Sequence, residues 1–253
     1  MKQFVSRLSI VLLLLAVCFG STNATAQYRH RGYNAPRHAH RSTGDRVVHG
    51  IYTAQAVGQA AQMGAALHSM ADYTGLRLGY NSASLHFSDI HGYDVDPLSG
   101  FNLGVVFGWY LGNTPFILEP GVYYSKKGGK FGGHDIDGGK NFTQKINMHM
   151  LEIPLDLKLD LMAPNSPVHF QPFIGAYMAF GMGGQIKDST DGNWDTFDTY
   201  DNFDAGLRFG CGLCLSNLYL EAAYDLGLTN MEDNHSYGDT NTRTFSINIG
   251  FNF

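Results

Sequence analysis

The sequence predicts an all-β protein, an eight-stranded antiparallel up-and-down transmembrane β-barrel preceded by a signal peptide and a short, partly helical N-terminal extension. Three observations favour it: period-two alternation of apolar with polar or small residues, alternating long and short connections, and 31 glycines with 13% aromatic and only 15% charged residues. This composition excludes a disordered chain, which would need few aromatics and high charge. It also excludes a polytopic helical membrane protein, whose spans each need about 20 consecutive apolar residues.

The first 26 residues have the pattern of a signal peptide. Two basic residues precede the apolar run Leu8 to Gly20, and the small residues Ala24 to Ala26 predict cleavage before Gln27. The run is too short to span a bilayer. A lipoprotein modified at Cys18 is the alternative, although Val17 is bulkier than the small residue expected before a lipidated cysteine.

Residues 27–73 form a basic extension that is rich in arginine and histidine. Its alanine- and glutamine-rich part, at about 51–71, predicts a helix that Gly58 and Gly64 weaken. The histidines lack cysteine or carboxylate partners at ligand spacing. We therefore expect a solvated periplasmic tail near anionic lipid or peptidoglycan rather than a metal site.

Residues 74–253 carry the barrel pattern, which is clearest at the end of the chain. Phe245, Ile247, Ile249, Phe251 and Phe253 share one face, and polar or small residues occupy the other. The same alternation over 101–111, 203–215 and 218–228 predicts strands of about eleven residues, long enough to cross a bilayer at a tilt. Noisier strands are expected at about 76–80, 116–125, 146–161 and 168–181.

One of these noisier strands changes its apolar parity. Ile146, Met148 and Met150 share one parity, and the leucines and isoleucine of 151–161 share the other. This phase switch requires a β-bulge near Met150.

The connections alternate strictly in length. Residues 88–99, 126–144, 183–200 and 229–241 are long loops, whereas 112–114, 162–167 and 216–217 are short turns. Outer-membrane barrels have long external loops and short periplasmic turns. The pattern therefore predicts an outer-membrane location with both termini in the periplasm.

The opposite faces of the strands are glycine-rich and carry isolated charges. Such a face suits the crowded interior of a small barrel, where charges must be paired. The predicted lumen charge network consists of Arg77, Glu119, Glu152, Asp156, Lys158, Arg208, Glu221 and Asp225. Interfacial aromatic belts are expected from Trp109, Tyr110, Tyr123, Tyr124 and Tyr224. The alternative is a secreted soluble lipocalin-like barrel, whose large apolar residues would face inward.

Four segments resemble the PorT-type outer-membrane β-barrel domain common in Bacteroidota. They are Leu118–Gly128, Leu151–Leu155, Pro172–Ala176 and Asp204–Gly206. The terminal Phe253 is similar to the C-terminal aromatic residue read by the barrel-assembly machinery. The resemblance covers about 74–253 and implies an eight-stranded outer-membrane barrel and, for the namesake of the family, a role in a secretion system that exports proteases. The basic extension does not match the family pattern.

The sequence favours a non-enzymatic barrel with a structural, anchoring or interaction role, in contact with outer-membrane lipid, the barrel-assembly machinery and an envelope or secretion-system protein. No cofactor and no nucleic-acid partner are expected. A narrow gated channel is the first alternative, although an eight-stranded lumen is just wide enough for its own side chains.

Three other patterns contain residue types that occur in chemical sites. Asp233, His235 and Ser236 have the residue types of a catalytic triad, but neighbours in sequence rarely reach its geometry. The segment 135–138 begins like a calcium loop, yet its twelfth position is Ile146 instead of a glutamate. In a strand, the isolated Cys-x-x-Cys pair at 211 and 214 points to opposite faces. We expect neither catalysis nor metal binding from these residues.

Overall fold

The computed structural model describes residues 58–59, 61–87, 94–134, 141–162, 167–188, 192–195, 202–229 and 240–253. The chain divides into two compact units, Met1–Ser69 and Met70–Phe253. In the first unit the described residues 58–59 and 61–69 are helical. No helix among the described residues is long and apolar enough to cross a membrane. The predicted signal peptide and most of the predicted extension lie outside the described residues.

Eight long strands build the second unit. They are β1 (Tyr73–Phe87), β2 (Asp94–Tyr110), β3 (Phe116–His134), β4 (Asn141–Leu159), β6 (Val168–Asp188), β8 (Phe203–Leu215), β9 (Leu218–Gly227) and β10 (Thr240–Asn252). Two short strands, β5 (Leu161–Met162) and β7 (Gly192–Asp195), pair with β6.

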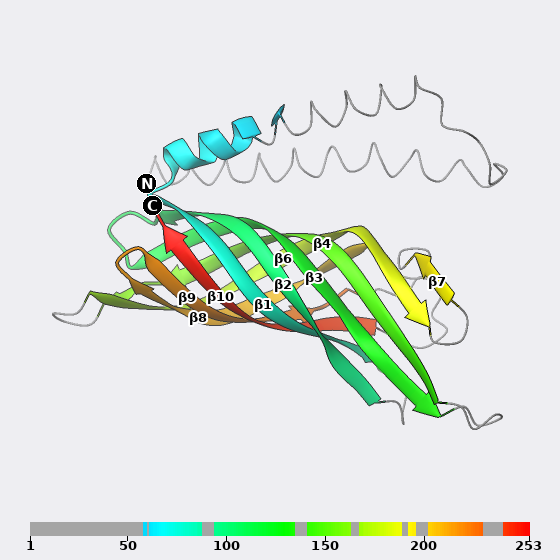
Figure 1. Ribbon diagram of the computed structural model, residues 1–253. Helices are drawn as coiled ribbons and strands as arrows, with labels where there is room; N and C mark the ends of the chain where they lie inside the picture. Colours follow the sequence, from blue (N-terminus) through cyan, green and yellow to red (C-terminus); the bar gives the residue numbers. More distant parts are fainter. Residues whose placement is uncertain are drawn as a thin grey trace, which may run out of the picture. The chain divides into compact units, whose positions relative to one another are not determined.

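The eight long strands close into a barrel, seen from the side in Figure 1. Each pairs antiparallel with its neighbour along the chain, and β1 completes the ring by pairing with β10, with Leu78 opposite Ile249. The last residue extends this closure, because Thr74 and Phe253 exchange both backbone hydrogen bonds, at 2.9 and 2.8 Å. No strand edge of the eight-membered ring is left unpaired along the closing seam.

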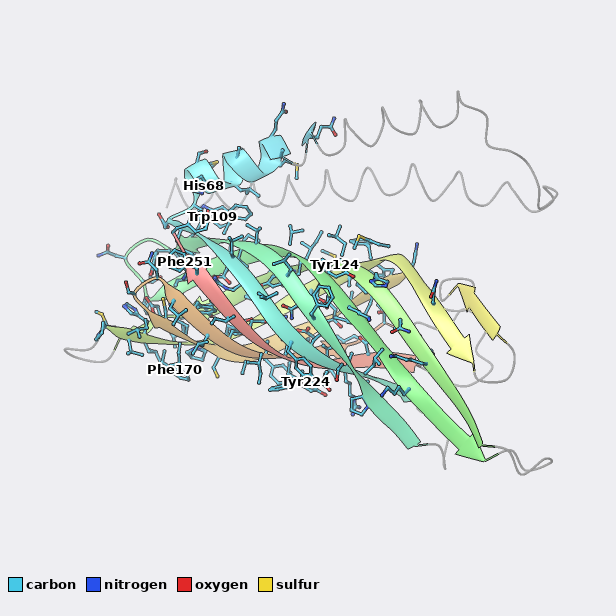
Figure 2. All side chains as sticks on the ribbon, viewed as in Figure 1. His68, Trp109, Tyr124, Phe170, Tyr224 and Phe251 are labelled. Carbon is cyan, nitrogen blue, oxygen red and sulfur yellow. The ribbon has the colours of Figure 1, made fainter. Side chains whose placement is uncertain are left out.

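The outer face is apolar and the inner face polar. On β10, Phe245, Ile247 and Ile249 are 45–55% exposed, whereas the alternating Ser246 and Asn248 are 1–2% exposed. Phe170 and Phe251, labelled in Figure 2, are among the exposed apolar side chains of the wall. This arrangement confirms the predicted apolar outer face. It contradicts the lipocalin-like alternative, in which the large apolar residues would fill the interior.

Several strands are longer than the sequence pattern predicts. β2 begins at Asp94, β3 continues to His134 and β4 begins at Asn141, so the predicted loops 88–99 and 126–144 are partly strand. The glycines after Lys127 break the side-chain alternation, but backbone pairing needs no side chain and continues to the pair His134 and Asn141. In Figure 1, β3 and β4 project beyond the other strands at the end of the barrel opposite the C-terminus.

The predicted phase switch in β4 is wrong. Ile146, Met148 and Met150 are 0–2% exposed and share the inner face with Glu152, and the register of β4 with β3 is unbroken through this stretch. A register shift does occur beside Met150, but the extra residue is Met182 on β6. The alternation of inward and outward side chains continues unbroken along β4. What changes is that the apolar residues face inward up to Met150 and outward from Leu151.

Two of the residues expected in the aromatic belts pack against other rings on the outer face. Tyr124 packs on Phe101 on the outer face with ring centroids 5.4 Å apart, and Tyr224 packs on Phe209 at 5.3 Å. Tyr123 is 5% exposed, because its parity on β3 directs it into the lumen. Trp109 is 4% exposed and its indole Nε1 donates to the carbonyl oxygen of Met70 at 2.9 Å. Tyr123 and Trp109 are therefore not belt residues.

Candidate functional site

The lumen of the barrel holds a continuous set of ion pairs, which we call the lumen network. Alternation on β1, β3, β4, β8 and β9 directs every second side chain inward, and each charge of the set lies on an inward position. The network consists of Arg77, Glu119, Lys127, Glu152, Asp156, Lys158, Arg208, Glu221 and Asp225, all at most 3% exposed.

Arg208 on β8 is the centre of this network. Its guanidinium contacts Asp225 and Glu221 at 2.9 Å each, Asp156 at 3.3 Å and Glu152 at 3.6 Å. The planar guanidinium presents five donors in a fixed fork, so it can bridge carboxylates from several strands, which an ammonium group does less well. One side chain thereby ties β4, β8 and β9 together across the lumen.

The end of the lumen nearer the C-terminus is organised by a second base. Lys158 Nζ lies 2.7 Å from Glu119 Oε1 and 3.6 Å from Glu221 Oε2, and it donates to the Tyr219 hydroxyl at 2.7 Å. Arg77 reaches Glu119 at 3.6 Å, and its guanidinium lies 4.2 Å from the centre of the Tyr219 ring. Cation–π contacts of this kind add to the ion pairs when both groups are out of water.

Lys127 extends the network toward the opposite end. Its Nζ lies 2.6 Å from Glu152 Oε2 and 3.8 Å from Asp225 Oδ2. The eight other members were predicted in the lumen from the sequence, whereas Lys127 was missed. Two consecutive lysines, Lys126 and Lys127, do not reveal which of them faces inward. Continuing the alternation from Tyr123 in steps of two residues would have assigned Lys127 to the lumen.

A smaller cluster of polar groups lies around Asp204. Its carboxylate accepts hydrogen bonds from the hydroxyls of Tyr177 at 3.0 Å, Thr242 at 2.6 Å and Thr229 at 2.9 Å. Lys127 Nζ lies 4.8 Å from the centre of the Tyr177 ring, which links this cluster to the network. Uncharged hydroxyl donors thus satisfy a buried carboxylate that forms no ion pair among the described residues.

Glycines make room for the aromatic rings inside the barrel. A Cβ on Gly104 would lie 2.4 Å from the Tyr123 ring, and one on Gly212 would lie 2.0 Å from the Tyr219 hydroxyl. These positions therefore exclude any larger residue while the rings stay in place. The glycine-rich face predicted from the sequence is the space that the lumen aromatics occupy.

The network leaves little open space. A cavity that it borders has a volume of about 10 Å³, and its lining includes Asn81, Asn102 and Ser246. Oxygen atoms of these three side chains have no hydrogen-bond partner among the described residues. A polar cavity of that volume accommodates about one water molecule and excludes an organic solute.

The other predicted sites give little chemistry. The Asp233, His235 and Ser236 set and the segment 135–138 lie outside the described residues. Cys211 and Cys214 are free thiols on β8, and no metal-binding group of three or more ligands occurs among the described residues. Phe253, the predicted assembly signal, has a 55% exposed side chain on the outer face and a paired backbone.

A closed ring of antiparallel strands, an apolar outer face and a charged, filled lumen define a class of protein, the β-barrel membrane protein. The chain belongs to the family described as the outer membrane protein beta-barrel domain, whose model matches residues 69–233. It is an outer-membrane barrel protein of eight strands.

Solved structures of outer-membrane proteins are similar to this chain. The Neisserial surface protein A matches at 13% identity with a TM-score of 0.42, covering 71% of this chain and 97% of its own. A major outer membrane protein from Thermus thermophilus matches at 14% identity with a TM-score of 0.41, covering 70% and 99%. OprG from Pseudomonas aeruginosa matches at 12% identity with a TM-score of 0.38, covering 72% and 96%. No curated protein matches the chain in sequence.

Proposed function

We propose that the protein is a non-enzymatic barrel with a closed lumen, which serves as a structural, anchoring or interaction element of the outer membrane. The observation that carries this proposal is the lumen network. Four bases and five carboxylates, drawn from five strands and at most 3% exposed, occupy the space through which a solute would pass. Among the described residues the plug consists of side chains of the wall itself, with no loop or helix that could swing aside to open it.

The orientation that we propose places both termini in the periplasm and the long connections outside. The turn Ser216–Asn217 and the residues 111–115 connect strands at the end of the barrel where Phe253 lies, and short turns are periplasmic in bacterial outer-membrane barrels. In this arrangement residues 1–26 are a cleaved signal peptide, residues 27–73 are a periplasmic extension, and Phe253 is the assembly signal read by the barrel-assembly machinery.

The proposed interaction role includes service to protein secretion. The PorT-type segments, such as Leu151–Leu155, favour an envelope or secretion-system protein as the partner. With its lumen filled, the barrel would hold such a partner through its loops or its periplasmic extension and would not carry cargo itself. Crosslinking in intact cells from the extension and from the loops would test which end meets a partner.

Planar-bilayer recording of the purified full-length protein tests the closed lumen directly. We expect no steady conductance steps from protein whose heat-modifiable gel mobility shows that it is folded. Reproducible single-channel steps from the folded protein would instead favour the alternative, a narrow gated channel. The variant Arg208→Met serves as the comparison, because removal of the central guanidinium should loosen the plug without changing the outer face.

A further inference from the structure

The outer face of β3, β4 and β6 changes character at one end of the barrel. Beyond Tyr124 and Leu151, the outward positions of β3 and β4 are no longer large and apolar, although Met182 on β6 is still exposed. Lys126 and Lys130 on β3 and Lys145 and His149 on β4 hold them instead. The pairs Lys126 with His149 and Lys130 with Lys145 are directly opposite in register.

Lys130 and Lys145 lie side by side with like charges, and the register places Lys187 of β6 opposite Lys145. Like charges directly opposite each other destabilise a sheet. Among the described residues, no carboxylate forms an ion pair with Lys126, Lys130 or Lys145. The register places Asp96 of β2 opposite Lys130, whereas the positions opposite Lys126 and Lys145 are held by basic residues. The basic residues Lys126 and Lys145, which have no carboxylate opposite them in the described part of the sheet, indicate an anionic ligand from outside.

The same surface is hollowed. β6 has the extra residue Met182 and two glycines without side chains at this place, and the polar hollow there has a volume of about 520 Å³. It is lined by Lys126, Lys145, Asn147, His149 and the segment from Met182 to Gln185. Its volume lies in the range of sites that bind small molecules, about 300–1,000 Å³.

The height of the hollow above the apolar band of the outer face, which on β4 ends at Leu151, indicates which class of lipid head group can reach it. His149 is two residues beyond Leu151 and Lys145 is six residues beyond it. At a rise of about 3.3 Å per residue and a tilt of about 40°, these positions lie about 5 Å and about 15 Å above the band. A phospholipid head-group layer is only about 5–7 Å thick, so it cannot reach both ends of the hollow. A phosphorylated sugar head group can.

We propose that the polar hollow binds the phosphorylated sugar head group of the outer-leaflet glycolipid, a lipopolysaccharide. Lys126 contacts the phosphate nearest the acyl chains, Lys145 contacts a phosphate farther out, and Asn147 and His149 bind the sugar between them. The inference rests on the proposed orientation, which places this end of the barrel outside. It assigns to the protein a fixed lipid neighbour along one side of its wall.

Binding can be measured by native mass spectrometry on the full-length protein in detergent, titrated with a diphosphorylated rough lipopolysaccharide. The double variant Lys126→Gln/Lys145→Gln should bind about 25-fold more weakly, at about five-fold for each lysine near a membrane surface. Lys126→Arg/Lys145→Arg should keep the affinity. The control is Arg243→Gln, which removes one exposed charge two residues before Phe245 on β10, outside the hollow.

Three results would overturn the proposal: an unchanged affinity in the double variant, an equal loss in Arg243→Gln, or equal binding of the dephosphorylated lipid. Lysine-dependent binding of phosphatidylglycerol as tight as that of the glycolipid would also contradict the sugar head group. Competition by inorganic pyrophosphate at equal affinity would reassign the hollow to a soluble anion.

Heat-modifiable mobility reports folding of each variant, and the single variant Lys145→Gln replaces the double variant if the double variant fails to fold. A folded, non-conducting barrel without glycolipid binding would refute this inference alone and leave the proposed function intact.

Discussion

Two levels of one strand, β4, show opposite side-chain chemistry. We call Leu151–Leu159 the lower level and Ile146–Met150 the upper level. In the segment that continues from Leu151 to Leu159, the leucines face outward and Glu152, Asp156 and Lys158 face the lumen. In the segment before it, Met148 and Met150 face the lumen and polar side chains face outward. The backbone register with β3 does not change between them.

The difference teaches that the surrounding solvent, not the strand, decides which face is apolar. A barrel wall in lipid must turn its apolar residues outward, and the same wall in water turns them inward. We therefore infer that the exchange between Met150 and Leu151 marks the edge of the bilayer on this side of the barrel. The two levels also differ inside the lumen, because ion pairs fill the lower level, whereas Met148 and Met150 pack beside Lys127 in the upper one.

The largest expected effect comes from breaking the lower level from inside. Arg208→Met leaves four carboxylates buried without their common partner, and breaking a buried charge network of this kind costs about 3–5 kcal/mol. Urea unfolding in detergent, followed by the loss of heat-modifiable mobility, measures the change. Arg243→Met, which removes an exposed arginine, should stay within about 0.5 kcal/mol. Equal effects of the two substitutions would contradict a stabilising role of the lumen network.

A lysine placed on the outer face distinguishes the two levels directly. Leu155→Lys puts a charge near the middle of the apolar band and should cost about 2–4 kcal/mol, whereas Asn147→Lys above the band should cost about 0–1 kcal/mol. Unfolding from phospholipid vesicles gives both values in one strand and with one incoming residue. Similar costs at the two positions would show that Asn147 also lies in lipid.

The upper level should respond to loss of apolar volume inside the barrel. Met148→Ala removes a side chain that is 1% exposed and should cost about 2 kcal/mol, the lower end of the range for such truncations because the site lies toward the barrel mouth. The conservative Met148→Leu, measured in the same unfolding assay, should cost less than about 1.5 kcal/mol. A neutral Met148→Ala would mean that this part of the lumen is open to water.

The smallest of these effects concerns the cluster around Asp204. Tyr177→Phe removes one of three hydroxyl donors to that carboxylate and keeps the ring that Lys127 contacts, so we expect a loss of about 1–2 kcal/mol. Thr244→Val serves as the control, since the Thr244 hydroxyl has no hydrogen-bond partner among the described residues and its loss should be close to neutral. A larger loss in Thr244→Val than in Tyr177→Phe would contradict this assignment of donors.

The sequence predicted the barrel where side-chain alternation is regular. On β10, the residues from Phe245 to Phe251 alternate without exception, and both the strand and its faces were correct. On β4 the strand was expected, but Ile146, Met148 and Met150 were assigned to the wrong face. Apolar residues were taken to face lipid at every height, and a periodic pattern contains no information about where the bilayer ends.

The lumen charges were easier to predict than their geometry. Arg208 and Glu221 lie on the glycine-rich face of strands whose alternation is regular. A charge on that face points into the lumen. Which base meets which acid depends on the shear of the barrel, which brings β1, β3 and β9 together around Glu119 and Lys158. The pairing of distant strands is set by closure of the whole sheet and leaves no local mark in the sequence.

The most direct test of the exchange between the two levels is a depth profile along β4. Single nitroxide labels at the outward positions 147, 149, 151, 153, 155 and 157, in the protein reconstituted into phospholipid vesicles, report contact with lipid-soluble oxygen relative to a water-soluble nickel chelate. We expect a low ratio at 147 and 149, a rise at 151, and a maximum near 155. A ratio that is as high at 147 and 149 as at 155 would contradict a membrane boundary between Met150 and Leu151.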